Sequence, residues 1–140
     1  MLYVGIAPKK PSRDGQESKS RLRTRVRYHY RGNAAGSTLR LTLGCLLADR
    51  FGIELRRVGS GERLTFTKQG EPTISEWMAE NAYVCWIEDE KPWDTEDEVI
   101  ARYDVPPNLD KNQRNIFHPE LSRIRAERRK AARLLPVLPR

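Results

Sequence analysis

The hydrophobic and polar positions along the chain fall into blocks that predict strands and helices. The first six residues, Met1–Ile6 (MLYVGI), are mostly branched or aromatic and predict a strand. Residues 8–20 contain almost no apolar side chain, so we expect a mobile loop there. Within residues 21–31, Leu22, Val26 and Tyr30 recur one helical turn apart, which indicates a helix with one apolar face.

The middle of the chain predicts a second helix, a hairpin and a short third helix. Ser37 is a candidate N-cap for a helix that runs to about Arg50 and carries a leucine-rich stripe. Residues 53–67 contain two strand-like runs around a Gly-Ser-Gly turn, which is typical of a hairpin, and a second turn follows at 68–70. Ser75 is expected to cap a short helix whose large apolar side chains point inward.

The last third of the chain predicts one more strand and two more helices. Tyr83–Ile87 (YVCWI) is continuously apolar, as expected for a buried strand. Thr95 is the candidate cap of a helix over Glu96–Tyr103, which the two prolines at 106 and 107 end. Residues 119–133 predict a long helix that is rich in arginine.

This order of elements predicts a small α/β (α+β) fold. We expect a short sheet of about three strands flanked by helices, within a domain that covers residues 1–112. Residues 113–140 are expected to form a basic helical tail. One compact domain with a tail suits a chain of 140 residues.

Charge and cysteine usage narrow the class of partner and the compartment. Lys and Arg number 26 against 19 Asp and Glu, and a net charge of +7 favours a polyanion such as nucleic acid as partner. The same composition also fits a basic protein that binds no nucleic acid. Cys45 and Cys85 lie in apolar runs without zinc-ligand spacing, so we expect two buried free thiols. Free thiols, no signal peptide and no membrane-spanning apolar run predict a cytoplasmic protein.

Four short motifs occur in an order that is similar to a known family. Tyr3-Val4-Gly5 is followed by LRTRV at 22–26, TEDEVI at 95–100 and VPPNL at 105–109. The first resembles the second half of the GIY-YIG signature, and the others resemble later motifs of the GIY-YIG nuclease superfamily. Their order and spacing are more specific than any one of them, and the run GNAAGSTLRLTLGCLL resembles a bacterial subgroup. The GIY half has no counterpart, so the resemblance implies a chain that lacks the family's first strand.

The resemblance implies a metal-dependent endonuclease that hydrolyses phosphodiester bonds, with DNA as the expected substrate. Tyr3 would activate the attacking water, Arg25 would bind the scissile phosphate, and His29 would add a contact and assist proton transfer near neutral pH. Glu96 would hold a single divalent ion, Mg²⁺ or Mn²⁺, which needs few protein ligands. The expected nucleic-acid contacts are Arg21, Arg23, Arg27, Tyr28, Arg40 and Asn108.

Each of these residues also has a simpler structural interpretation. Tyr3 could be an aromatic side chain at the rim of the core, and Arg25 could be one more surface charge among neighbouring arginines. His29 could be a histidine packed inside the protein. Glu96 lies in an acidic run typical of a solvated face, and Asn108 follows two prolines as turn residues do. Two classes of function therefore stay open. One is an endonuclease, and the other is a non-catalytic nucleic-acid-binding module or a truncated, inactive relative.

Overall fold

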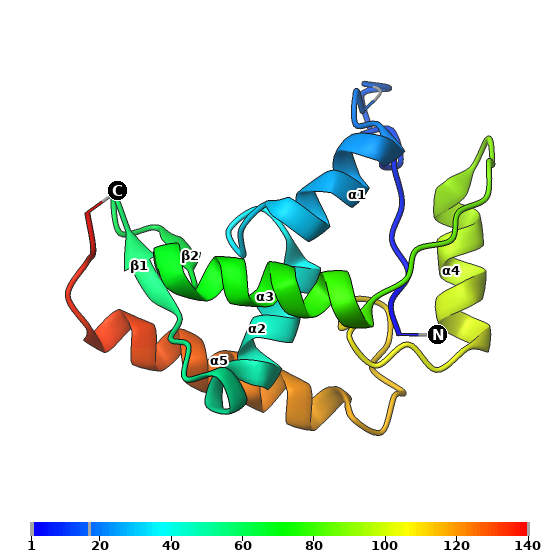
Figure 1. Cartoon of the computed structure of the whole chain (residues 1–140). Helices are drawn as coiled ribbons and strands as arrows, with labels where there is room; N and C mark the ends of the chain where they lie inside the picture. The colour runs from blue at the N-terminus through cyan, green and yellow to red at the C-terminus, as the bar shows by residue number, and fades with distance from the viewer. Residues whose placement is uncertain (1, 17, 140) are drawn as a thin grey trace.

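The computed structural model describes residues 2–16 and 18–139, which form five helices and one two-stranded sheet (Figure 1). The helices are α1 (Leu22–Arg31), α2 (Thr38–Phe51), α3 (Thr67–Asn81), α4 (Pro92–Arg102) and α5 (His118–Leu134). The strands are β1 (Arg56–Val58) and β2 (Arg63–Thr65). This mixture confirms the predicted α+β class. Of the helices within the described ranges, none is both long enough and apolar enough to cross a membrane.

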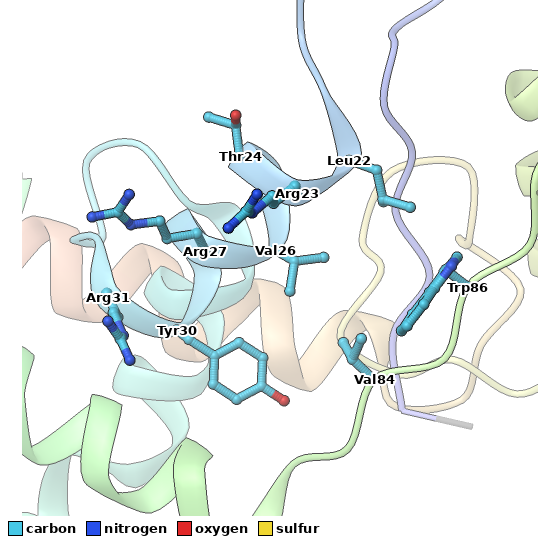
Figure 2. Close-up of a pocket in the computed structure, with 9 residues that line it drawn as sticks. All are labelled: Leu22, Arg23, Thr24, Val26, Arg27, Tyr30, Arg31, Val84 and Trp86. Atoms are coloured by element: carbon cyan, nitrogen blue, oxygen red, sulfur yellow. The ribbon is translucent and has the colours of Figure 1, made fainter.

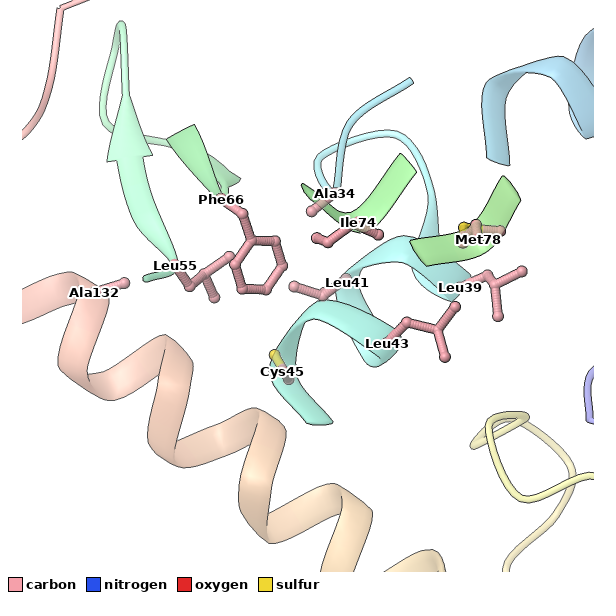
Figure 3. Packing of buried hydrophobic residues seen from close by; sticks show 10 residues of the cluster. All are labelled: Ala34, Leu39, Leu41, Leu43, Cys45, Leu55, Phe66, Ile74, Met78 and Ala132. Atoms are coloured by element: carbon pink, nitrogen blue, oxygen red, sulfur yellow. The ribbon is translucent and has the colours of Figure 1, made fainter. Parts of the chain in front are cut away.

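Helix α2 forms the centre of the hydrophobic core. It packs against α3 and α5, and α1 packs against α3. Neighbouring segments cover α2 on nearly every side, so its buried surface is wider than the single stripe that the leucine pattern predicts. The main cluster of buried side chains (Figure 3) comprises Ala34, Leu39, Leu41, Leu43, Cys45, Leu55, Phe66, Ile74, Met78 and Ala132.

Three residues set the ends and the close packing of α2. Ser37 caps its N-terminus as predicted, because its Oγ accepts a hydrogen bond from the N–H of Arg40 at 3.1 Å. Gly52 ends the helix in the left-handed region, with a φ of 60° that glycine adopts without strain. Gly44 lies directly against the ring of Phe66, and any larger residue would overlap that ring.

The predicted hairpin is confirmed, and the C-terminal segment lies along its free edge. β1 and β2 pair antiparallel, with Arg57 opposite Leu64. On the other side of β1, the N–H of Gly59 donates to the carbonyl of Leu138, and the N–H of Leu138 donates to the carbonyl of Arg57, both at 2.9 Å. The C-terminal segment therefore satisfies backbone groups of an edge strand that would otherwise stay open.

Two segments expected to be strands belong to no sheet. Residues 2–6 form no strand, and Met1, the first residue of that predicted strand, lies outside the described residues. Tyr83–Ile87 is not buried, since Tyr83 is 96% exposed and Cys85 is also exposed. The backbone groups of this segment form no hydrogen bond with another backbone group in the described part of the chain. The predictions of two strands here and of a buried Cys85 were wrong. No neighbouring strand reaches either segment, so the described residues contain two strands instead of about three.

Helices α3 and α4 begin earlier than the sequence predicts. Residues 68–70, expected to be a turn, belong to the first turn of α3, and Ser75 lies inside that helix. Glu71 stabilises the early start, because its Oε1 accepts a hydrogen bond from the N–H of Phe66 at 3.1 Å. α4 begins at Pro92, three residues before the predicted cap Thr95, since proline fits the first turn of a helix.

Candidate active site

Three separate parts of the chain meet around Tyr3. The N-terminal segment runs beside α1 in Figure 1, and the half-buried ring of Tyr3 meets the ring of His29 edge-on. The two ring centroids are 5.8 Å apart at an interplanar angle of 76°. Arg25 on α1 and Glu96 on α4 both act electrostatically on the Tyr3 hydroxyl. Tyr3, Arg25, His29 and Glu96 are therefore brought together, although they come from three parts of the chain.

Asn108 fixes the backbone beside Tyr3. Its Oδ1 accepts a hydrogen bond from the N–H of Val4 at 3.0 Å, and its Nδ2 donates to the carbonyl of Val4 at 2.8 Å. The side-chain amide thus pairs with Val4 in the way that a neighbouring strand would. Asn108 is buried, and both polar atoms of its side-chain amide are bonded inside the protein. Asn108 was expected to contact nucleic acid, but the structure does not place it on an open surface.

The Tyr3 hydroxyl lies between opposing charges. Burial raises its pKa above the ordinary value for tyrosine, and the negative charge of Glu96 raises it further. Arg25 opposes both effects, because its positive charge and its hydrogen bond lower the pKa of the same hydroxyl. The net direction is upward, so Tyr3 keeps its proton at neutral pH.

His29 is neutral in the folded protein. Burial lowers its pKa to about 4, and the positive charges of Arg25 and Arg40 add to this effect. Its Nδ1 lies 2.7 Å from the Oγ of Ser37, the same hydroxyl that caps α2. The expectation of a histidine that titrates near neutrality was wrong, since this ring is buried among cations.

Arg25 offers an unused donor at the centre of this group. The side chain is half-buried, and its Nε is shielded from solvent without a hydrogen-bond partner among the described residues. A buried donor without a partner is costly, and native proteins rarely leave one. The guanidinium of Arg25 could therefore accommodate an oxygen of an anion beside Tyr3.

Glu96 is the candidate metal ligand of the site. Its side chain is mostly buried, and the Nζ of Lys111 lies 3.5 Å from its Oε2. The same ammonium makes a much closer ion pair with Asp97, so Glu96 is not the main partner of Lys111. In the described part of the chain, no three His, Cys, Asp or Glu side chains gather into a metal site. A single carboxylate suits an ion such as Mg²⁺, which keeps several waters, and does not suit structural zinc.

Arg40 has a structural role and does not face a ligand. Its side chain is fully buried, and its Nη2 forms an ion pair with the Oε2 of Glu71 at 2.8 Å. Its Nη1 donates to the carbonyl oxygens of His29 and Tyr30 at 3.0 and 3.2 Å. The expectation that Arg40 contacts nucleic acid was wrong, because every nitrogen of its guanidinium is bound inside the protein.

The remaining candidate contacts lie on the outside of α1. Arg21, Arg23 and Arg27 are exposed. The Tyr28 ring packs over the turn that follows α1, where Gly32 and Gly36 leave room for it. The three arginines are therefore accessible to an anionic partner, whereas part of the Tyr28 ring is packed against the turn at Gly32 and Gly36.

Sequence reasoning missed two residues beside these candidates. Ser37 was identified as a helix cap, but not as the hydrogen-bond partner of His29. Lys111 was not identified as the cation beside Glu96. The single sequence does not reveal these two contacts, because each joins a helix to a residue outside it, 8 and 15 positions away.

Comparison with known proteins gives one match. The model of the GIY-YIG catalytic domain family matches residues 1–130, which is most of the chain. No curated protein and no solved structure matches. The family match covers all four motifs that carry the resemblance in the sequence. The chain therefore belongs to the GIY-YIG nuclease superfamily.

Proposed function

We propose that this protein is a metal-dependent endonuclease that hydrolyses phosphodiester bonds, with DNA as its substrate. The observation that carries the proposal is the convergence of Tyr3, Arg25 and Glu96, since both charged residues act on one tyrosine hydroxyl. A cationic donor, and a carboxylate that can hold a metal ion, are groups that stabilise the charge developing in phosphodiester hydrolysis. The net charge of +7 supports a polyanionic substrate.

Arg25 binds the scissile phosphate in this proposal. Its Nε, which has no partner among the described residues, and its terminal nitrogens form a fork that matches two phosphate oxygens. These donors stabilise the negative charge that develops as water attacks phosphorus. The protonated Tyr3 hydroxyl accepts a hydrogen bond from the attacking water and orients its lone pair toward phosphorus, and the proton of that water passes to solvent as the bond from phosphorus to the leaving oxygen breaks. Asn108 holds Tyr3 in position through the backbone of Val4.

His29 positions its neighbours and does not act as an acid. With a pKa of about 4, its ring is neutral at neutral pH and lacks the acidic proton that a general acid donates. Its contact with Tyr3 and its hydrogen bond to Ser37 fix the tyrosine ring against the start of α2.

Glu96 would hold the divalent ion, Mg²⁺ or Mn²⁺. Such an ion supplies positive charge to the phosphate and to the leaving oxygen. Lys111 stays on Asp97 when Glu96 takes up this role, because that ion pair is the closer of its two contacts.

The second candidate is a basic module that binds nucleic acid without cutting it. Lys111 favours this reading, because an ammonium beside Glu96 already compensates the carboxylate charge. The two functions differ in their response to chelators. Binding by a module falls with salt but is unaffected by EDTA, whereas cleavage by the nuclease stops when EDTA removes the ion.

A nicking assay on supercoiled DNA tests the proposed function. Mg²⁺-dependent nicking is expected from the wild-type chain, and none from Glu96→Ala. Glu98→Ala is the matched control, since this exposed carboxylate lies on the same helix and forms no ion pair with another described residue. Arg25→Ala should lower the rate about 100- to 1,000-fold, as loss of one transition-state donor does elsewhere. Nicking that survives in Glu96→Ala would remove Glu96 from the site.

A further inference from the structure

A groove of about 860 Å³ lies between α1 and the unpaired segment Tyr83–Ile87 (Figure 2). Figure 2 shows Leu22, Val26 and Tyr30 of α1 on one side, and Val84 and Trp86 on the other. The Tyr30 hydroxyl closes one end, because it donates to the carbonyl of Ala82 at 2.8 Å. The size of the groove suits a flat organic group.

The apolar wall of the groove is open to solvent. Trp86 is 67% exposed and Val84 is 46% exposed, although both belong to the most apolar run of the chain. An exposed tryptophan on the wall of a groove offers its face to an aromatic ligand, and every nucleic-acid base has such a face.

A stripe of cations runs along the same groove. Arg23, Arg27 and Arg31 line it from α1 at four-residue intervals, so they lie about 6 Å apart along the helix axis. None of the three forms an ion pair with another residue in the described ranges. A regular row of free guanidinium groups beside an apolar wall fits a chain of phosphates whose bases lie on the apolar side.

We infer that this groove binds unpaired nucleotides, with a base stacked on Trp86 and the phosphates along Arg23, Arg27 and Arg31. This inference rests on the proposed nuclease function and names the substrate: DNA with a single-stranded stretch beside the cleaved bond. A duplex does not fit, because its bases are stacked on each other and present no free face to Trp86. The acidic residues Glu88, Asp89 and Glu90 follow Trp86 in sequence, and their charge would repel phosphates.

The groove lies on the face of α1 next to the candidate active site. Arg25 and His29 project from one side of the Leu22, Val26 and Tyr30 stripe, and the three arginines project from the other side. A strand that reaches from the three arginines to Arg25 would therefore cross the Leu22, Val26 and Tyr30 stripe.

Fluorescence anisotropy with labelled oligonucleotides tests this inference. The binding assays use the full chain carrying Glu96→Ala, which prevents cleavage and leaves the groove intact. A single-stranded oligonucleotide and a blunt duplex of equal length are the two probes. Trp86→Ala should weaken single-strand binding roughly 5- to 150-fold and leave duplex binding unchanged. Tyr83→Ala is the matched control, because this aromatic belongs to the same segment, is more exposed and does not line the groove.

The arginine stripe has its own readout. Arg27→Gln should reduce the slope of log K against log salt for the single strand by about 0.7, as loss of one phosphate contact does. Arg133→Gln on α5 removes the same charge away from the groove and should leave that slope unchanged.

Three outcomes would overturn the inference. One is equal binding of the single strand by the Glu96→Ala chain with and without Trp86→Ala, and another is an equal loss on adding Tyr83→Ala. The third is a dimer that Trp86→Ala converts to a monomer, since a second copy would then cover the groove. Failure of the proposed function looks different: no Mg²⁺-dependent nicking of any DNA, with Trp86-dependent single-strand binding retained.

Discussion

Arg40 and Glu71 form a buried ion pair that sets the position of α1. The guanidinium binds Glu71 through Nε and Nη2, at 3.1 and 2.8 Å from Oε2, and its Nη1 caps two carbonyl groups in the last turn of α1. The other carboxylate oxygen of Glu71 accepts hydrogen bonds from the N–H groups of Ala34 and Phe66. One ion pair thus joins α1, α2, α3 and the turn between α1 and α2. Because α1 carries Arg25 and His29, this pair also determines where those two residues lie.

Loss of Arg40 should destabilise the whole fold. Arg40→Met leaves the Glu71 carboxylate buried without its cation, and such a change costs about 3–5 kcal/mol of unfolding free energy. Urea denaturation measures this quantity. Arg128→Met is the control, because Arg128 pairs with the exposed Asp49 and its loss should have little effect on stability. Equal effects of the two substitutions would show that the buried pair does not hold α1.

Asn108 should matter more for activity than for stability. Asn108→Ala removes both hydrogen bonds to Val4 and should cost about 1–3 kcal/mol of unfolding free energy. It also releases Tyr3 from its position, so nicking should fall steeply. Hydrogen exchange at the Val4 amide reports the loss directly, and Gln113→Ala, an exposed amide nearby, should leave it unchanged. Slow exchange at Val4 in Asn108→Ala would contradict the role of this side chain.

His29 should make the protein less stable in mild acid. Its pKa is about 4 in the folded state against 6.5 for a free side chain, so the unfolded chain takes up the proton first as pH falls. The contribution of neutral His29 is complete above about pH 6.5 and is lost as pH falls from there toward 4. The loss should be of the order of 3 kcal/mol.

NMR titration of the two histidines checks this directly. The His29 ring signals should not shift between pH 8 and about pH 5, and His29→Gln should flatten the dependence of stability on pH in that window. A midpoint near 6.5 for His29 would contradict its burial among cations.

Gly44→Ala should destabilise the core although alanine is the better helix former. Helix propensity alone would make this change stabilising by about 1 kcal/mol. The added methyl group overlaps the ring of Phe66, and overpacking of this kind costs about 1–3 kcal/mol. Thermal unfolding gives the sign of the effect. A higher melting temperature in Gly44→Ala would mean that Phe66 has room to move away.

The two cysteines should differ strongly in reactivity. Cys45 is buried, and burial raises the pKa of its thiol to about 11, whereas Cys85 is exposed. A thiol reagent should therefore label one cysteine of the native protein rapidly, and the second only after denaturation. Cys85→Ser should abolish the rapid reaction. Rapid labelling that persists in this variant would show that the core around Cys45 opens readily.

The helices could be predicted because their signals are local. Ser37 and Gly52 mark the ends of α2, and the four-residue spacing of Leu22 and Val26 indicates α1. Gly70 and Pro72 hid the start of α3, since both residues normally interrupt helices. A carboxylate from within the helix, that of Glu71, stabilises this start through contacts that the local sequence does not reveal.

Strands and buried charges were harder to predict because they depend on distant partners. Tyr83–Ile87 has the composition of a buried strand, but no described strand lies beside it. An arginine is normally a surface residue, but Arg40 is buried because it pairs with Glu71, 31 positions later. The four candidate catalytic residues were identified by their resemblance to a family, and periodicity alone would not have separated Glu96 from its acidic neighbours.

The two hydrogen bonds between Asn108 and Val4 join residues that are 104 positions apart. Loops of this length close slowly, because the chain loses conformational entropy before the contact contributes any stabilising free energy. During synthesis the N-terminal segment emerges long before Asn108 does. A nascent chain therefore carries Tyr3 and Arg25 without the clamp that fixes them, and the candidate site assembles only after Asn108 has left the ribosome. The same two bonds that complete the site thus tie its assembly to the synthesis of a residue 104 positions later.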